Sequence, residues 1–266
     1  MKKNQIYLHQ DYQVMKCIFT YILLFITILS QGQTNANTNV SLFSEDIFTY
    51  NSSNYIQELA KDMDTLFFNR YEEEILDFEK EDSAKGITKG EILFVGSSSF
   101  KKWTNIETDL FPLRVLNRGF GGSTMPELDY YFFRIVRPYK PAAIVIYEGD
   151  NDVLAPFLTS SVILKSFDIF VQLTKQFLPN TKVFFVSVKP SPSRVDYLKK
   201  MQETNSLIKS YCTKDKNLFY IDITKHMFNE DGQIREDIFR NDRIHINEKG
   251  YKIWSEIIKV DLMRNM

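Results

Sequence analysis

The stretch Glu91–Phe100, with the sequence EILFVGSSSF, indicates the fold class of this 266-residue chain. It begins with a short apolar run, which is typical of a strand that is covered on both faces in a parallel sheet. Four similar runs follow along the chain, and they lie at Leu113–Leu116 (LRVL), Ala143–Tyr147 (AIVIY), Lys182–Val188 (KVFFVSV) and Leu218–Ile221 (LFYI). The sequence therefore predicts five short strands.

Apolar residues at helical spacing separate these runs and follow the last one. The sets are Leu128, Tyr131, Phe132 and Ile135; Phe167, Phe170, Val171, Thr174 and Leu178; Leu198, Met201, Asn205, Ile208 and Cys212; and Tyr251, Trp254, Ile257 and Ile258. Because strands that alternate with helices imply right-handed crossovers, we predict an α/β fold: a three-layer α/β/α sandwich with a mainly parallel five-stranded sheet. Sites in such sheets form in the loops at the carboxyl ends of the strands.

The first two strands run into turns that suit the binding of an anion. Gly96–Phe100 (GSSSF) can expose a hydroxyl beside the backbone N–H groups of a helix start, although a serine-rich turn is more often only a helix cap. Asn117–Ser123 (NRGFGGS) contains glycines that let the backbone approach a ligand closely. A dinucleotide-binding loop is the competing interpretation of this segment, but that fingerprint follows the first strand of its unit.

Two further motifs carry an amide and a base. Glu148–Asp152 (EGDND) is either a polar turn or a strand end from which Asn151 projects a neutral N–H donor. Asp242 precedes His245 by three residues, so its carboxylate can accept from Nδ1 of the imidazole and leave Nε2 free as a base. Asn247 follows as an expected cap of the last helix.

In this order the four motifs resemble blocks I, II, III and V of the SGNH hydrolases, a branch of the GDSL-type esterase and lipase superfamily. The resemblance runs from about Glu91 to about Lys259 and implies the flavodoxin-like fold of that family. It also implies that Ser98 is the nucleophile and that Asp242 and His245 complete a catalytic triad.

The same resemblance implies an oxyanion hole made of the backbone N–H groups of Ser98 and Gly122 and the side-chain amide of Asn151. The sequence departs from the family pattern at two positions, because Ser97 replaces the block I aspartate and Ser123 replaces the aspartate that often follows the block II glycine. We expect altered loop hydrogen bonds there. The run of three serines leaves Ser97 and Ser99 as alternative nucleophiles.

Other residues with reactive side chains have simpler interpretations. His226 lies four residues after Asp222, a spacing that favours a structural role over that of a base. Cys212 falls on the apolar face of its helix, which predicts a buried and inert thiol. No cluster of His, Asp and Glu has the spacing of metal ligands, so we expect neither a metal nor a cofactor.

Composition excludes several classes of protein. With 33 Lys+Arg against 34 Asp+Glu, the chain has a formal net charge of −1 and lacks the basic surplus that nucleic-acid binding requires. Two cysteines cannot form a disulfide framework. The hydrophobic share of 44% suffices for a folded core. No pattern indicates an oligomeric state.

The N-terminus has the pattern of a secretory signal peptide. Cys17–Leu29 (CIFTYILLFITIL) is an uncharged apolar run after Lys16, shorter than the roughly 20 residues that span a bilayer. We predict a signal peptide over 1–33, with Met15 as an alternative start, and a secreted or periplasmic protein without a stable membrane span after cleavage. An uncleaved N-terminal anchor is the alternative.

The remaining chain divides into a polar linker over 34–55, a helical lead-in over 56–85 and a hydrolase domain over 86–264. The lead-in has apolar residues at helical spacing, which are Ile56, Leu59, Met63, Leu66, Phe67, Tyr71 and Phe78. Lys189–Arg194 (KPSPSR) follows the fourth strand and is either a rigid loop or a segment that contacts substrate.

The resemblance thus predicts a serine esterase that acts through an acyl-enzyme on a small-molecule or glycan ester. Removal of an acetyl group from a saccharide is the first expectation. A lysophospholipase or thioesterase, and a noncatalytic glycan-binding module, are the alternatives.

Overall fold

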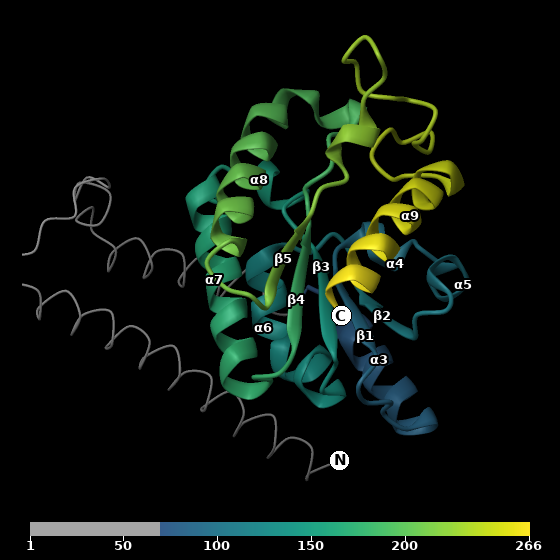
Figure 1. Cartoon of the computed structure of the whole chain (residues 1–266), viewed down its shortest axis with the longest axis vertical. Helices are drawn as coiled ribbons and strands as arrows, with labels where there is room; N and C mark the ends of the chain where they lie inside the picture. Colours follow the sequence, from purple (N-terminus) through teal and green to yellow (C-terminus); the bar gives the residue numbers. More distant parts are fainter. Residues whose placement is uncertain (1–69) are drawn as a thin grey trace, which may run out of the picture. The chain divides into compact units, whose positions relative to one another are not determined.

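A computed structural model describes residues 70–266, so the predicted signal peptide, the linker and the first part of the helical lead-in lie outside the described residues. Within the described part, five strands form one sheet in the order β2-β1-β3-β4-β5 (Figure 1). All neighbouring strands are parallel. The strands are β1 (Ile92–Gly96), β2 (Val115–Gly119), β3 (Ala143–Tyr147), β4 (Lys182–Val186) and β5 (Leu218–Ile221).

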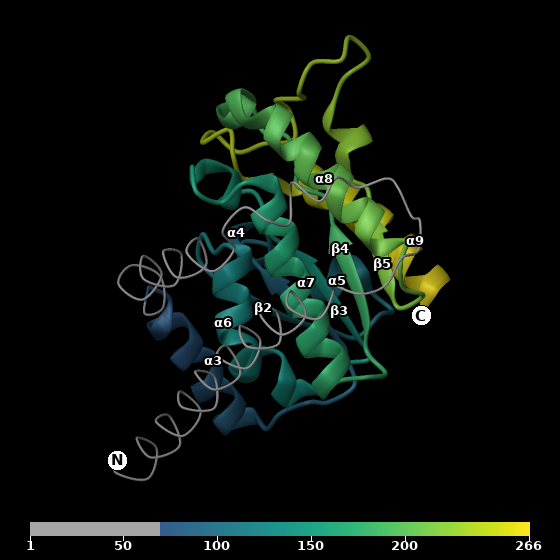
Figure 2. The same cartoon turned by 90° about the vertical axis from the view of Figure 1, so that its left-hand side faces the viewer.

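Helices cover both faces of this sheet (Figures 1 and 2). On one face lie α4 (Ser98–Lys101), α5 (Ile106–Leu110) and α9 (Glu248–Asn265). On the other lie α6 (Met125–Ile135), α7 (Ser160–Phe177) and α8 (Leu198–Cys212), and α3 (Glu72–Lys85) packs against α6. The predicted α/β/α sandwich with a parallel five-stranded sheet is confirmed.

The apolar runs form strands because both of their faces are buried. In β1, Phe94 points into a cluster with Trp103 and Trp254 under α9, while Leu93 and Val95 are buried beneath the opposite helices. Burial of each such side chain contributes about 1.5–3 kcal/mol relative to exposure. An exposed sheet face would have given alternating polar residues instead.

Strand β2 differs from its predicted range of 113–116 at both ends, because it begins at Val115 and continues through Asn117 and Arg118 to Gly119. Arg118 is buried in the strand, and it forms ion pairs with Glu81 and Asp82 of α3 at 3.0 and 2.7 Å. A charged side chain is tolerated there because the lead-in helix supplies its partners. The apolar pattern alone could not show this.

Strand β4 ends at Val186, two residues earlier than predicted. Beyond it, the N–H and carbonyl of Val188 bond to the side-chain amide of Asn205 on α8, at 2.8 and 2.9 Å, rather than to a neighbouring strand. At the last helix, Asn247 caps α9 as predicted, because its side chain accepts from the N–H groups of Lys249 and Gly250. No helix within residues 70–266 is long and apolar enough to cross a membrane.

Candidate active site

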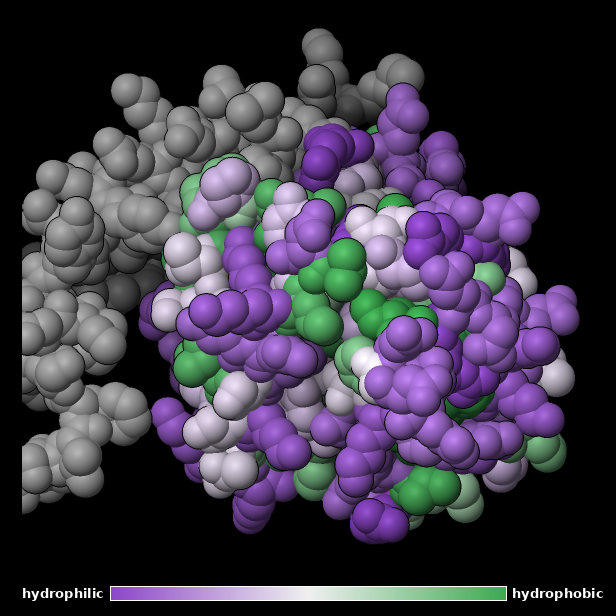
Figure 3. Space-filling view, turned by 90° about the horizontal axis from the view of Figure 1, so that it is seen from above, coloured by the Kyte–Doolittle hydropathy of each residue, from purple (hydrophilic) through white to green (hydrophobic). Residues whose placement is uncertain are grey.

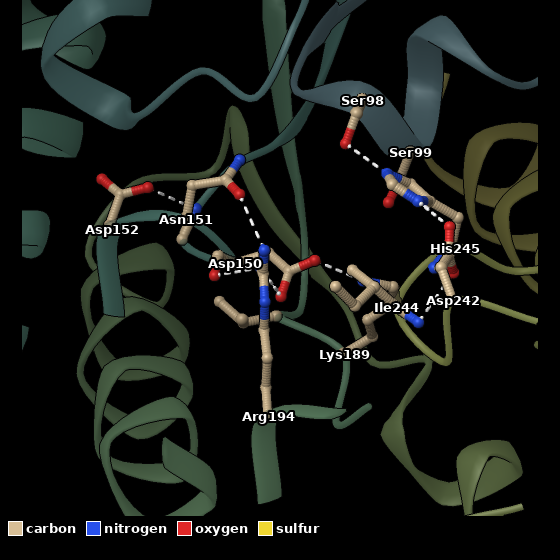
Figure 4. A network of polar contacts seen from close by, with 12 residues as sticks. Ser98, Ser99, Asp150, Asn151, Asp152, Lys189, Arg194, Asp242, Ile244 and His245 are labelled. Carbon is tan, nitrogen blue, oxygen red and sulfur yellow. Dashed lines mark hydrogen bonds and ion pairs between the residues drawn. The ribbon is translucent and has the colours of Figure 1, made fainter. Parts of the chain in front are cut away.

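The four sequence motifs meet at the carboxyl edge of the sheet. Ser98 is the first residue of α4, directly after β1, and Asn151 follows β3. Asp242 and His245 lie in the loop that leads into α9. Figure 4 shows Ser98, His245 and Asp242 as one hydrogen-bonded group, with Asp150, Asn151 and Arg194 as a second group beside it. Because all the strands are parallel, their carboxyl ends lie at the same edge of the sheet.

Ser98, His245 and Asp242 form a continuous hydrogen-bonded chain. His245 Nε2 lies 3.0 Å from Ser98 Oγ, and His245 Nδ1 lies 2.7 Å from Asp242 Oδ2. The other carboxylate oxygen, Oδ1, accepts from the backbone N–H groups of Ile244 and His245, both at 2.9 Å. Arg243 turns the loop with a φ of 58°. The carboxylate is therefore held by its own loop while it orients the imidazole.

The protonation states of His245 and Asp242 suit proton transfer from Ser98. Burial lowers the pKa of His245 below its ordinary value, although the hydrogen bond and charge of Asp242 oppose that shift. Burial alone would raise the pKa of Asp242, but hydrogen bonds from His245 and the loop N–H groups outweigh it and hold this pKa well below its usual range. At neutral pH the imidazole is neutral, its Nδ1–H donates to an ionised Asp242, and the Nε2 lone pair faces Ser98.

Of the three adjacent serines, Ser98 is the one within hydrogen-bond distance of His245. The side chains of Ser97 and Ser99 are buried in the turn, 1% and 0% exposed. Ser98, by contrast, is only half-buried. Its N–H is among the first of a helix, which have no intrahelical acceptor.

The side-chain amide of Asn151 has a defined orientation. Its Nδ2 donates to the carbonyl of Ser123 at 2.9 Å, and its Oδ1 accepts from Nη2 of Arg194 at 3.1 Å. Because an amide carries two N–H bonds, the second one is available to a ligand. Arg194 is itself held by an ion pair between Nη1 and Asp150 Oδ1 at 2.6 Å.

The Lys189–Arg194 segment connects the two groups of Figure 4. Lys189 is fully buried and forms an ion pair with Asp150. Ser193 donates through its hydroxyl to the carbonyl of Asp242 at 3.0 Å and through its N–H to the carbonyl of Arg243 at 3.2 Å. The segment thus braces both the Asn151 amide and the loop of Asp242. The sequence marked this loop, but it did not distinguish Arg194 as the residue that holds Asn151.

Gly122 donates its backbone N–H to the hydroxyl of Tyr71, at 3.2 Å. Tyr71 precedes α3, far from the other site residues in sequence. The sequence pattern placed it on the apolar face of the lead-in and assigned it no role at the site. The one signal for Tyr71 was the helical spacing of the apolar residues around it, which predicted that its side chain would be buried against the domain.

The sequence model of the GDSL-like lipase/acylhydrolase family matches residues 87–253, which include all four motifs. The chain belongs to this family. It is therefore a carboxylic ester hydrolase by family. No curated protein matches the chain.

Solved structures of this fold resemble the domain. A GDSL-like lipase from Bacteroides thetaiotaomicron has a TM-score of 0.63 at 22% identity, with 72% of this chain and 98% of that chain covered. A carbohydrate esterase of family 3 from Talaromyces cellulolyticus has a TM-score of 0.54 at 15% identity, with 66% and 97% covered. An acetyl-xylooligosaccharide esterase from Geobacillus has a TM-score of 0.52 at 17% identity, with 65% and 94% covered. At these identities the likeness is one of fold.

Ser123, one of the two departures from the family pattern, makes hydrogen bonds of its own. Ser123, which stands where family members often have aspartate, has its Oγ 2.6 Å from Glu148 Oε1 and 3.2 Å from the carbonyl of Phe120. A hydroxyl carries one proton, so both contacts are hydrogen bonds only if Glu148 is protonated and donates to Ser123. Burial, with the charge of Asp152, raises the pKa of Glu148 well above its ordinary range, which agrees with this arrangement. Glu148 and Ser123 together support the loop of Gly122.

The remaining candidates lie apart from the site. His226 is exposed on a short 3-10 helix, Thr224–Met227, and Asp222 accepts from the N–H and hydroxyl of Thr224. Cys212 is buried, and burial raises the pKa of its thiol to about 12. Within residues 70–266, no group of three or more His, Cys, Asp and Glu is arranged to hold a metal ion.

Proposed function

We propose that this family member is a serine esterase that hydrolyses a carboxylic ester through an acyl-enzyme. The observation that carries the proposal is the chain from Ser98 Oγ through both nitrogens of His245 to Asp242, at 3.0 and 2.7 Å. In the first step, His245 Nε2 takes the Ser98 proton as Oγ forms a bond to the ester carbonyl carbon. The carbonyl oxygen becomes an oxyanion beside the N–H groups of Ser98 and Gly122 and the amide of Asn151.

The tetrahedral intermediate then collapses. The bond from the carbonyl carbon to the alcohol oxygen breaks, and His245 gives its proton to that oxygen. In deacylation, His245 takes a proton from water, the hydroxide oxygen attacks the acyl carbon, and the proton returns to Ser98 as the acid leaves. Asp242 stabilises the imidazolium in both halves.

For the substrate we propose a small acyl group, such as acetyl, on a saccharide. Among the proteins of similar fold are an acetyl xylan esterase and an acetyl-xylooligosaccharide esterase, which supports this class. Exposed apolar side chains on the loops beside Asn151 and Arg194 offer contact surface for a bound ester, because aromatic and apolar surfaces line many ligand sites. They are Leu154, Phe157, Val195 and Tyr197. Figure 3 looks down on this end of the molecule and shows apolar side chains amid a largely hydrophilic face.

We also propose that the protein is exported from the cell. The apolar run Cys17–Leu29 and the residues that flank it support export, although they lie outside the described residues. Saccharide esters at the cell surface or in the medium would then be accessible to the enzyme.

A panel of esters tests the substrate class. The panel pairs acetyl, butyryl and long-chain acyl groups with sugar and glycerol alcohols, and Ser98→Ala serves as the control. We expect the highest kcat/KM on acetylated sugars and no turnover by Ser98→Ala. A preference for long-chain glycerol esters would favour a lysophospholipase. Failure of a fluorophosphonate probe to label the folded wild-type protein would favour a noncatalytic module.

A further inference from the structure

The segment before α3 lies outside the part of the chain that the family model matches, yet it reaches the candidate oxyanion hole. The match begins at residue 87, whereas Tyr71 places its hydroxyl 3.2 Å from the N–H of Gly122. The ring of Tyr71 packs edge-on against Phe120, with centroids 5.3 Å apart. Tyr71, which lies outside the matched residues, therefore contacts the N–H of Gly122, one of the expected oxyanion donors.

Contacts on both sides of Tyr71 hold it in place. Arg70 makes two hydrogen bonds to the carboxylate of Glu127, at 3.1 and 2.9 Å. Glu74 accepts from the N–H of Gly121 at 3.0 Å and from Lys101 of the Ser98 helix at 2.7 Å. The first turn of the lead-in helix is thus tied both to the glycine loop and to the helix that carries Ser98.

Gly121 provides the space for the aromatic ring. A Cβ at this position would stand 2.0 Å from Cε1 of Tyr71, and the residue has a φ of 36° that disfavours other side chains. At Gly122, a Cβ would lie 3.6 Å from the Tyr71 hydroxyl and 3.7 Å from Nδ2 of Asn151. The hydroxyl and the amide therefore both lie close to the same glycine.

The Tyr71 hydroxyl has a proton to donate. It accepts from Gly122, and among residues 70–266 no group accepts its own proton. Burial, followed by the charge of Glu127, raises the pKa of Tyr71 to about 12, so the phenol stays protonated at neutral pH. A neutral, immobilised O–H beside a backbone N–H is the kind of donor that stabilises an oxyanion.

We propose that Tyr71 is a further catalytic residue of the esterase, whose O–H donates to the oxyanion beside the N–H of Gly122 and the amide of Asn151. This inference rests on the proposed function. In the free enzyme, the N–H of Gly122 donates to the hydroxyl oxygen of Tyr71. When the ester carbonyl oxygen binds, the Tyr71 O–H donates to it, and the Gly122 N–H donates to that same oxygen in place of Tyr71.

Tyr71→Phe tests the proposal, because it removes the hydroxyl and keeps the ring on Gly121 and Phe120. On 4-nitrophenyl acetate we expect kcat to fall at least about tenfold, toward the 10²–10³ typical of an oxyanion donor, with KM changed by less than about threefold. Tyr211→Phe is the matched control, since its hydroxyl donates to Asp168 at 2.6 Å, away from the site, and kcat should be unchanged. Thermal unfolding of both variants establishes that each is folded.

A second measurement separates a catalytic role from a structural one. A small alkyl boronic acid forms a tetrahedral adduct with Ser98, so it should inhibit Tyr71→Phe at least about tenfold more weakly than wild type. A kcat for Tyr71→Phe that equals or exceeds the wild-type value would overturn the proposal. The hydroxyl would then only occupy the Gly122 N–H until the substrate binds. Wild-type turnover by Ser98→Ala would instead overturn the proposed function, independently of Tyr71.

Discussion

Arg194 donates through Nη2 to Oδ1 of Asn151 at 3.1 Å, and this contact decides which way the amide faces. With Oδ1 engaged, both N–H bonds of the amide lie on the opposite side, where one reaches the carbonyl of Ser123 and the other is available to a ligand. An arginine on the loop after β4 therefore sets the orientation of a candidate oxyanion donor on the loop after β3.

Arg194→Met should lower kcat about tenfold with little change in KM, because the amide loses the contact that orients it for the transition state. Arg194→Lys keeps a positive charge near Asp150 but loses the planar fork, so we expect an intermediate kcat. Arg235→Met is the matched control, since Arg235 pairs with the exposed Asp237 away from the site. Steady-state kinetics on an acetyl ester provide the measurement. Equal losses in the Arg194 and Arg235 variants would show that Arg194 acts only through stability.

Asn151→Ala should raise the barrier by about 2.7–4 kcal/mol, a loss of 10²–10³ in kcat, if the amide donates to the oxyanion. Labelling of Ser98 by a fluorophosphonate reports whether the nucleophile is still in place in this variant. A loss of less than tenfold in kcat would remove Asn151 from the oxyanion hole.

Turnover should depend on pH through His245, which must be neutral to accept the Ser98 proton. Because burial lowers the pKa of His245 below its ordinary value of about 6.5, kcat/KM should rise with pH to a plateau, with a midpoint below 6.5. The rate is lost as the pH falls through that pKa, where the imidazole becomes protonated. A pH profile on a neutral ester checks this, and a midpoint above pH 7 would contradict it.

Asp242→Asn should lower kcat by about 10⁴ at neutral pH, because an amide in place of the carboxylate no longer selects the tautomer with Nε2 free. The measurement is kcat on the same acetyl ester, together with the thermal unfolding temperature. If the substitution unfolded the protein, the unfolding temperature would fall. We expect it to stay close to that of wild type while kcat is lost. A kcat within tenfold of wild type would exclude the assigned role of Asp242.

Glu148→Gln should flatten the dependence of stability on pH. The pKa of Glu148 is raised by burial in the folded state, so the folded protein keeps a proton that the unfolded chain releases above its ordinary pKa of about 4.3. The wild-type free energy of unfolding therefore falls as pH rises from about 4.3 through the raised pKa. A glutamine side chain does not titrate. The free energy of unfolding of Glu148→Gln, relative to that of wild type, should therefore increase between pH 5 and pH 9.

Denaturant unfolding at pH 5, 7 and 9 measures this difference. Glu230→Gln is the control, because Glu230 is an exposed carboxylate. Parallel pH dependences for wild type and Glu148→Gln would show that Glu148 does not hold a proton in the folded state.

Much of the fold could be predicted because burial on both faces leaves its mark within each strand. Ala143–Tyr147 and Leu218–Ile221 are apolar over short runs, and the structure has strands with those bounds. The prediction was wrong at the end of β2, where Arg118 is buried against Glu81 and Asp82. Those carboxylates lie on a helix far away in sequence, so no local pattern could show that the charge is compensated.

The sequence by itself determined the order of the motifs, the fold that brings strand ends together and the residue types that ester chemistry needs. Local pattern suffices for these because periodicity and turn residues act over a few positions. The tertiary structure alone decided that Ser98 rather than its neighbours lies 3.0 Å from His245, that Arg194 orients Asn151, and that Tyr71 reaches Gly122. These pairs are 147, 43 and 51 residues apart, and each contact depends on how packed elements set the direction of one side chain.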